Sequence, residues 1–305
     1  MPVTREPALL QPKIEEFLNH CRARNLSQNT IRAYRSDLFE FVELSGGSEI
    51  TVDQVNRKLI RCVVVQLHDG GSKSVTVRRK LAAVKSFCKW LECEGLLDPN
   101  LIGLITGPRR RQELPDVAKH DEIKKLIEGT VMPERERLIL ELLYGSGLRV
   151  AELVGINLED FREDDLLLVR GKGKKERLVI VGEYAREALR AWLARREGLL
   201  RGMGLKTRAL FFSVGPHRSA ERLDVRSVGR IVKAIAKTSG LDPDRFHPHA
   251  LRHAFATHLH DNGAPLQAIS VLLGHARLST AALYTRVSIG RMMRTYNAAH
   301  PHAQR

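Results

Sequence analysis

Residues His247-Pro248-His249-Ala250-Leu251-Arg252-His253 place imidazoles and a guanidinium where a helix over residues 250–262 is predicted. His249 and Arg252 are three positions apart, so they share one helical face. Such a pair suits phosphoryl transfer, because the imidazole moves a proton and the guanidinium holds negative charge. Each histidine alone is equally explained as a structural residue with satisfied ring nitrogens. No carboxylate or thiol joins them at ligand spacing, so no metal site is predicted.

Two segments upstream also suit a phosphate. In residues 145–149 (GSGLR), glycines precede Arg149 at a predicted helix start, and Arg149 can fork onto phosphate oxygens. In residues 171–175 (GKGKK), a glycine-flanked hairpin turn presents Lys172, which can protonate a leaving oxygen. The turn is not a P-loop, because the required pattern and the following helix are missing. Taken singly, each segment is also explained as a solvated basic surface.

Two segments downstream complete the set. In residues 272–275 (LLGH), Gly274 ends an apolar helix and leaves His275 at its terminus. In residues 283–286 (LYTR), the hydroxyl of Tyr284 is a candidate nucleophile. A lone tyrosine in a helix more often packs in a core, so this assignment depends on the other four segments.

Length, composition and charge narrow the class of protein to which these segments belong. The chain has 305 residues, which favours two domains, and 43% of them are hydrophobic, which excludes a disordered chain. The four cysteines show no paired spacing, and neither a signal peptide nor a membrane-spanning run is recognised, so we expect a soluble protein of a reducing compartment. The net charge of +15 favours nucleic acid as the partner over a membrane surface, although a merely basic surface explains it too.

Hydrophobic periodicity predicts a protein that is mainly α, with a small antiparallel β-sheet. Four helices are expected in residues 1–103; their inward positions include Ile14, Phe17, Leu38 and Leu81. Residues 104–116, with Gly107-Pro108 and three arginines, are predicted to be an interdomain linker. In residues 117–305, strands are expected at 166–169, 178–181 and 210–212, and helices over most of the remainder.

Taken together and in this order, the segments resemble the tyrosine recombinase (phage integrase) family, with the Xer recombinases most similar in layout. The matching strings are YGSGLRVAEL, GKGKKERL, PHALRHAFATHL and LLGHARLSTAALYTRV. A helical domain precedes them, and the resemblance covers nearly the whole chain. The positions that match the family's catalytic set are Arg149, Lys172, His249, Arg252, His275 and Tyr284.

The resemblance implies a mechanism for these residues. Tyr284 attacks a DNA phosphodiester and becomes joined to the 3′ phosphate, while Arg149 and Arg252 hold the non-bridging oxygens. Lys172 protonates the departing 5′ hydroxyl, His249 takes the tyrosine proton, and His275 adds a hydrogen bond to the phosphate. No cofactor and no metal are implied, because the arginines supply the positive charge that a divalent ion otherwise gives.

The resemblance also implies partners. Four protomers on two DNA duplexes exchange strands through a Holliday junction, as a homotetramer or with a second recombinase, and an accessory protein is a further candidate. The expected setting is the cytoplasm, at the nucleoid. The C-terminal helix is expected to dock on the neighbouring protomer through Ile289, Met292, Met293 and Tyr296, in preference to its own domain. Chromosome or plasmid dimer resolution and mobile-element integration or excision share this chemistry and stay open.

Two other functions are alternatives: a non-catalytic DNA-binding protein on the same scaffold, and a type IB topoisomerase-like enzyme that relaxes supercoils. The complete catalytic set argues against the first, and the size and the Xer-like strings argue against the second. Further candidates for DNA contact are basic residues of the fourth helix, the linker and the hairpin. These are Arg78, Arg79, Lys80, Arg109, Arg110, Arg111, Lys174, Lys175 and Arg177.

Overall fold

The structure, a computed structural model, describes residues 8–98, 116–163, 165–171, 176–214, 221–274 and 286–303, without the side chains of 286–289 and 291. The chain divides into two compact units, Met1–Glu113 and Leu114–Arg305. This division falls inside the predicted linker 104–116, of which only residue 116 is described. The domain limits 1–103 and 117–305 therefore stay predictions.

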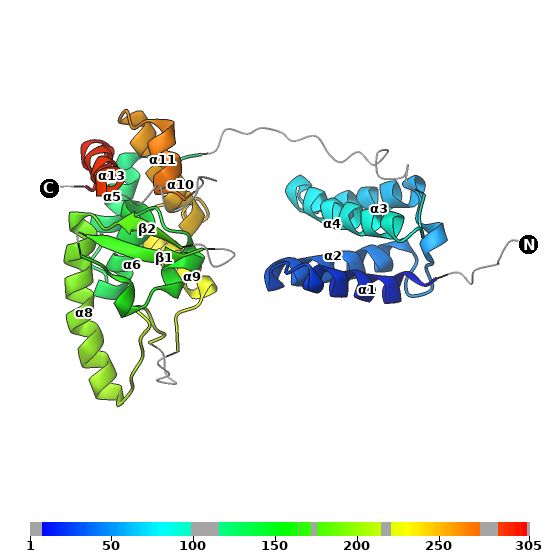
Figure 1. Ribbon diagram of the computed structural model, residues 1–305, viewed down its shortest axis with the longest axis horizontal. Helices are drawn as coiled ribbons and strands as arrows, with labels where there is room; N and C mark the ends of the chain where they lie inside the picture. The colour runs from blue at the N-terminus through cyan, green and yellow to red at the C-terminus, as the bar shows by residue number, and fades with distance from the viewer. Residues whose placement is uncertain are drawn as a thin grey trace, which may run out of the picture. The chain divides into compact units, whose positions relative to one another are not determined.

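Four α-helices form the described part of the N-terminal unit (Figure 1). They are α1 (Leu10–Ala23), α2 (Gln28–Ser45), α3 (Arg57–Asp69) and α4 (Ser74–Cys93), with a 3₁₀ turn, η1 (Val52–Gln54), before α3. Ser27 caps α2, as its residue type suggests, because its hydroxyl accepts a hydrogen bond from the Thr30 amide at 3.2 Å.

The inward positions Ile14, Phe17, Leu38 and Leu81 are buried as expected, in one hydrophobic core that contains an aromatic cluster. The Phe17 ring lies 5.5 Å from Phe87 and 5.9 Å from Trp90. Periodicity predicts a third helix through Val55, Leu59 and Val63, and this is wrong in detail, because Val55 is buried but precedes α3. The reason is local, since the Asn56 side chain accepts from the Leu59 amide and so starts the helix at Arg57.

In the described part of the C-terminal unit, helices pack around a two-stranded sheet. The helices are α5 (His120–Glu128), α6 (Glu134–Gly145), α7 (Val150–Gly155), α8 (Glu183–Met203), α9 (Val225–Thr238), α10 (Pro248–Asp261), α11 (Leu266–Leu272) and α13 (Arg286–Ala299), with a 3₁₀ turn, η3 (Leu158–Asp160). Every residue of α6 from Leu138 to Gly145 is buried, so this helix forms the centre of the core. Figure 1 shows α10, α11 and α13 gathered together, and all three contact one another.

The sheet is the expected antiparallel hairpin of β1 (Leu166–Arg170) and β2 (Glu176–Ile180). Leu166 pairs with Ile180 at the open end of the hairpin, and Arg170 pairs with Glu176 next to the turn. The third strand expected at 210–212 does not form as such. Ala209 and Phe212 each make a single bridge, to Asn157 and Arg222, and the apolar run between them is buried in the core. The apolar character of residues 210–212 is explained by their burial in the core, since they have no continuous strand partner among the described residues. The fold class, mainly α with a small antiparallel sheet, is confirmed in the described residues.

The C-terminal helix α13 packs on its own unit in this single chain. Tyr296 and Ala299 belong to the buried core, and Met292 and Met293 pack against it. Ile289, the fourth residue of the predicted apolar face, lies outside the described side chains. Docking of this helix on a neighbouring protomer stays a prediction.

Candidate active site

The loop between α6 and α7, residues 145–149, carries the first predicted catalytic arginine and is held tightly. The Ser146 hydroxyl donates to the carbonyl of Ile180 on β2 at 2.8 Å. Gly147 has a positive φ of 59°, and a Cβ added there would lie 2.6 Å from the Phe255 ring on α10. Only glycine fits this position, because any side chain would meet both the ring and an unfavourable backbone region.

Arg149 is the N-cap residue of α7, where the glycine-rich sequence predicted a helix start. Its amide donates to Oε2 of Glu152 at 2.9 Å, and its guanidinium donates to Oε1 of the same carboxylate at 2.8 Å. Glu152 therefore orients both the backbone and the side chain of Arg149. The Arg149 side chain remains 43% exposed, so part of its guanidinium faces solvent.

Arg252, the second predicted arginine, lies on α10 and is buried at 7% side-chain exposure. It donates to the carbonyl of Gly147 in the arginine loop, and to the carbonyl of Leu273 after α11 at 2.7 Å. Burial, together with the nearby charges of Arg149 and Arg177, lowers the pKa of Arg252 to about 10. It therefore keeps its charge at neutral pH, and it ties three chain segments to one point.

His249 precedes Arg252 by three residues but is exposed near the start of α10. The His247 side chain caps this helix by accepting from the Ala250 amide at 3.1 Å, and Pro248 occupies the first turn. The spacing thus places His249 at the surface above a buried Arg252. A proton-transfer group at the surface and a charge-holding group beneath it are consistent with the two predicted roles.

Glu152 joins the arginines at the centre of the site, and sequence reasoning missed it. Its carboxylate is 2% exposed, lies 2.9 Å from Nη2 of Arg177 and 4.0 Å from Nη1 of Arg252, and also binds Arg149. Burial alone would raise the pKa of Glu152, but hydrogen bonds and charge from Arg177 and Arg149 outweigh it and hold the pKa below its usual range. The Glu152 carboxylate accepts from the Arg149 amide, which is one half of a capping box, and a glutamate three residues after a predicted helix start was the signal present in the sequence.

Arg177 was predicted to contact DNA, and the structure gives it a different place. Its side chain is 8% exposed, with Nη2 on Glu152 and Nη1 donating to the carbonyl of Leu272. A Cβ added to Gly274 would lie 2.5 Å from the Arg177 side chain, so the chain after α11 lies directly against it. We therefore treat Arg177 as a residue that positions Glu152, because its guanidinium forms a direct ion pair with that carboxylate.

The remaining catalytic candidates, Lys172, His275 and Tyr284, lie outside the described residues, as do Arg109, Arg110, Arg111, Lys174 and Lys175. In sequence, Lys172 and His275 each directly follow a described residue. β1 ends at Arg170, two residues before Lys172. The carbonyls of Leu272 and Leu273, just before His275, accept from Arg177 and Arg252.

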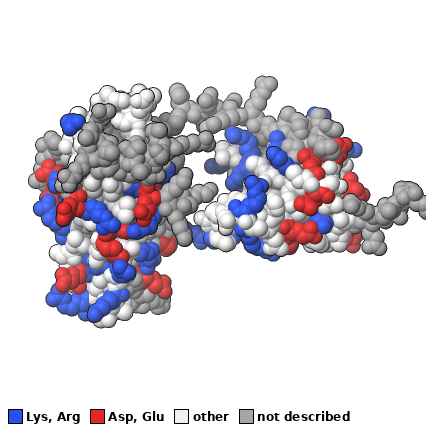
Figure 2. Space-filling view, in the orientation of Figure 1, with Lys and Arg blue, Asp and Glu red and all other residues white. Residues whose placement is uncertain are grey.

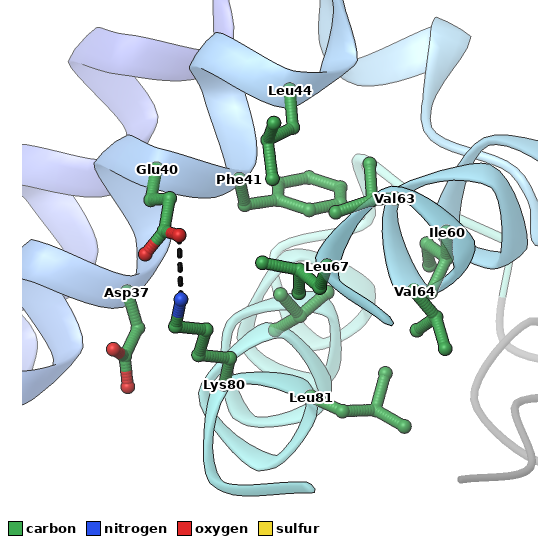
Figure 3. A pocket seen from close by; sticks show the side chains of 11 residues that line it. Asp37, Glu40, Phe41, Leu44, Ile60, Val63, Val64, Leu67, Lys80 and Leu81 are labelled. Atoms are coloured by element: carbon green, nitrogen blue, oxygen red, sulfur yellow. Dashed lines mark hydrogen bonds and ion pairs between the residues drawn. The ribbon is translucent and has the colours of Figure 1, made fainter. Parts of the chain in front are cut away.

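The other predicted basic residues lie on α4 of the N-terminal unit. Arg79 forms an ion pair with the buried Asp37 of α2, and Lys80 reaches Glu40 at 2.5 Å (Figure 3). Arg78 is half-buried, and no ion pair or hydrogen bond engages its side chain among the residues that the structure describes. Figure 2 shows basic side chains gathered over one part of this unit's visible face and acidic ones over another.

His258 illustrates the structural alternative for a histidine of α10. Its ring lies 3.0 Å from both the Tyr144 hydroxyl and the Ala118 carbonyl, and burial lowers its pKa. Within the described ranges, no cluster of three or more histidine, cysteine, aspartate or glutamate side chains is arranged to hold a metal. The helices in those ranges include none long and apolar enough to cross a membrane.

Comparison with known proteins agrees with this geometry. Residues 116–291 match the phage integrase family, and residues 14–95 match the phage integrase N-terminal SAM-like domain. The tyrosine recombinase XerC of Thermodesulfovibrio yellowstonii is 38% identical over 296 residues, covering 94% of this chain and 96% of that protein.

Solved structures with a similar fold include the following two recombinases. One is the XerH site-specific recombinase bound to its palindromic difH substrate in a post-cleavage complex, with a TM-score of 0.67 and 23% identity, covering 93% of this chain and 83% of that one. The other is a lambda integrase tetramer bound to a Holliday junction, with a TM-score of 0.68 and 19% identity, covering 91% and 77%.

The chain therefore belongs to the phage integrase family. Within that family it is a tyrosine recombinase of the Xer type, because its similarity to an Xer recombinase extends over nearly the full length of both chains. This confirms the family that the sequence motifs indicated.

Proposed function

We propose that the chain cleaves and rejoins DNA strands at a specific site through a covalent bond to Tyr284. The observation that supports this most directly is the convergence of Arg149 and Arg252 on one buried carboxylate, Glu152. Two guanidiniums fixed in this way can hold the non-bridging oxygens of one phosphate without rearranging when charge develops on it.

Each step of the proposed reaction balances. The Tyr284 oxygen attacks phosphorus, the bond from phosphorus to the 5′ oxygen breaks, and a 3′-phosphotyrosine forms. His249 accepts the tyrosine proton, and Lys172 gives a proton to the departing 5′ oxygen. His275 donates a hydrogen bond to the phosphate. A 5′ hydroxyl of a second strand then reverses these steps and releases Tyr284.

The proposed assembly is a tetramer on two duplexes, of this chain alone or with a second recombinase. Lambda integrase forms a tetramer on a Holliday junction, and XerH binds its difH substrate, so both proteins provide precedents within the fold. We assign Arg78 to the DNA surface of the N-terminal unit ahead of Arg79 and Lys80, whose charges are paired with Asp37 and Glu40. Duplex DNA as substrate implies action in the cytoplasm, at the nucleoid.

The test is covalent trapping on nicked duplexes. After cleavage, the short strand that carries the 5′ hydroxyl diffuses away, so the strand cannot be rejoined and the protein stays attached to the DNA. Duplexes from the host's replication terminus and from the flanks of the chain's own gene are mixed with the protein and then denatured. We expect a protein–DNA adduct on one of them and none with Tyr284→Phe, which should still bind. The duplex that reacts separates dimer resolution from a mobile-element role. Cleavage that persists in Tyr284→Phe would refute the nucleophile, and adducts on randomised sequence would favour a topoisomerase-like activity.

A further inference from the structure

The C-terminal segment, residues 296–303, lies directly against the arginine loop 145–149. The Tyr296 side chain is 1% exposed, and its hydroxyl donates to the carbonyl of Gly145 at 2.9 Å. Burial keeps the pKa of Tyr296 well above its ordinary value, so the hydroxyl stays protonated and acts as a donor. Gly145 is the last residue of α6 and the first of the loop, so this bond fixes one end of it.

The surroundings leave Tyr296 little freedom. A Cβ added to Gly182, at the start of α8, would lie 2.5 Å from the Tyr296 hydroxyl oxygen and 3.0 Å from the carbonyl of His302. The backbone at Gly182 thus forms a wall that holds the hydroxyl toward Gly145. The glycine makes room for the ring where any other residue would displace it.

A second contact reaches the middle of the loop. The His300 ring stacks on Tyr296 with ring centres 5.0 Å apart at 8°, and it lies 5.1 Å from the Phe255 ring. Phe255 is the ring that presses on Gly147, whose carbonyl accepts from Arg252. The C-terminal segment therefore contacts the loop at Gly145 directly and at Gly147 through one intervening ring.

We propose that Tyr296 and His300 are positioning residues for the two catalytic arginines. They brace the loop so that Arg149 and the Gly147 carbonyl, which holds Arg252, stay in one arrangement before DNA arrives. This inference rests on the proposed function for its effect on cleavage, but the brace itself exists in the DNA-free protein. Preorganised charge of this kind is what phosphoryl transfer needs, and displacement by about 1 Å costs on the order of 100-fold in rate.

The first experiment measures the brace without catalysis. Tyr296→Phe keeps the ring and removes the donor, and Tyr144→Phe is the matched control. Tyr144 is also fully buried and also makes one hydroxyl contact, but to His258 and not to the loop. We expect amide hydrogen exchange in residues 145–153 to speed up by about tenfold or more in Tyr296→Phe and to stay near wild type in Tyr144→Phe. Unchanged exchange in Tyr296→Phe, or an equal change in both variants, would overturn the brace.

The second experiment asks whether the brace acts through the arginines. Single-turnover cleavage at saturating DNA is compared on a normal scissile phosphate and on a methylphosphonate, which lacks one charged oxygen. Tyr296→Phe is expected to slow cleavage of the phosphodiester about 10- to 100-fold and to slow the neutral substrate much less, because the arginines have less charge to hold there. An equal loss on both substrates would mean a general structural role.

Gly182→Ala provides a second route should Tyr296→Phe fold poorly, because it displaces the hydroxyl without removing it, and the same pattern is expected. The two proposals can fail separately. If the wild-type protein forms no adduct, but Tyr296→Phe still speeds up hydrogen exchange as expected, the proposed function is contradicted and the brace stands.

Discussion

Replacing Glu152 by glutamine tests the central electrostatic argument, because it keeps the shape of the side chain and removes its charge. In the wild type this carboxylate lies 2.8 Å from Nη1 of Arg149 and 2.9 Å from Nη2 of Arg177, with Arg252 at 4.0 Å. Three guanidiniums share one negative charge. Glutamine would leave them without compensation, and its amide group would place donors against donors.

The magnitude follows from burial. Two unit charges about 4 Å apart attract by about 4 kcal/mol at an effective dielectric constant of about 20. Removing one partner of a buried pair costs about 3–5 kcal/mol, since the other charge stays desolvated. The C-terminal unit has 305 − 113 = 192 residues. For a domain of that size, about 3 kcal/mol corresponds to a fall of about 6–12 °C in the unfolding midpoint.

The assay is thermal unfolding followed by circular dichroism, together with the rate of adduct formation on a nicked duplex. Because Arg149 loses the group that orients it, we expect cleavage to slow on the order of 100-fold. Glu176→Gln is the control. That residue lies on β2 and, like Glu152, pairs with an arginine, Arg170, but its side chain is 51% exposed, so the substitution should leave the midpoint nearly unchanged. An unfolding midpoint and a cleavage rate in Glu152→Gln that both match Glu176→Gln would refute the reasoning.

Three further outcomes are expected. Gly147→Ala should destabilise the protein by about 1–3 kcal/mol, because Gly147 has a positive φ and the Phe255 ring would lie 2.6 Å from the new Cβ. Gly155→Ala is the control, because the space at its Cβ is open and its stability should not change. Equal denaturation midpoints in the two variants would contradict this. Arg78→Ala should reduce the slope of log DNA affinity against log salt concentration by about 1. Arg177→Ala should lower the stability of the protein and leave that slope unchanged, and filter binding across a salt series distinguishes the two variants. Burial lowers the pKa of His300 well below its usual value and also lowers that of His258. The unfolded chain therefore binds more protons below about pH 6.5, and the unfolding midpoint should fall as pH drops from 7.5 to 5.5. His300→Gln should flatten this dependence, and a wild-type midpoint that is independent of pH would contradict it.

Local sequence was sufficient to predict what local physics determines. The inward positions of the N-terminal helices, the cap at Ser27 and the helix start at Arg149 all follow from spacing and residue type. The hairpin follows from two apolar runs around a glycine-rich turn. Its strand ends were correct to within two residues, because β1 and β2 pair with each other and need no distant partner.

The misplaced residues depend on contacts between distant segments. Arg177 follows two lysines and a glutamate, so composition suggested an exposed basic run. A strand turns alternate residues to opposite faces, however, and β2 directs Arg177 into the core, where Glu152 of α7 compensates its charge. Glu152 itself was visible as a capping partner of Arg149, but its contact with Arg177 requires α7 and β2 to pack side by side. No pattern within either segment contains that information.

The charge balance of the site fits the proposed binding of a phosphate. Arg149, Arg177 and Arg252 carry three positive charges and Glu152 carries one negative charge, so the cluster has a net charge of 3 − 1 = +2. The carboxylate gives this cluster enough compensation to fold, while the excess charge remains for a ligand. A phosphodiester carries one negative charge, and its five-coordinate transition state carries two. The cluster therefore matches the transition state better than the ground state, and a difference of this kind would accelerate the proposed cleavage. In the proposed site the exposed Arg149 is the charge that an incoming phosphate meets first, and the buried Arg252 is a fixed charge beneath it.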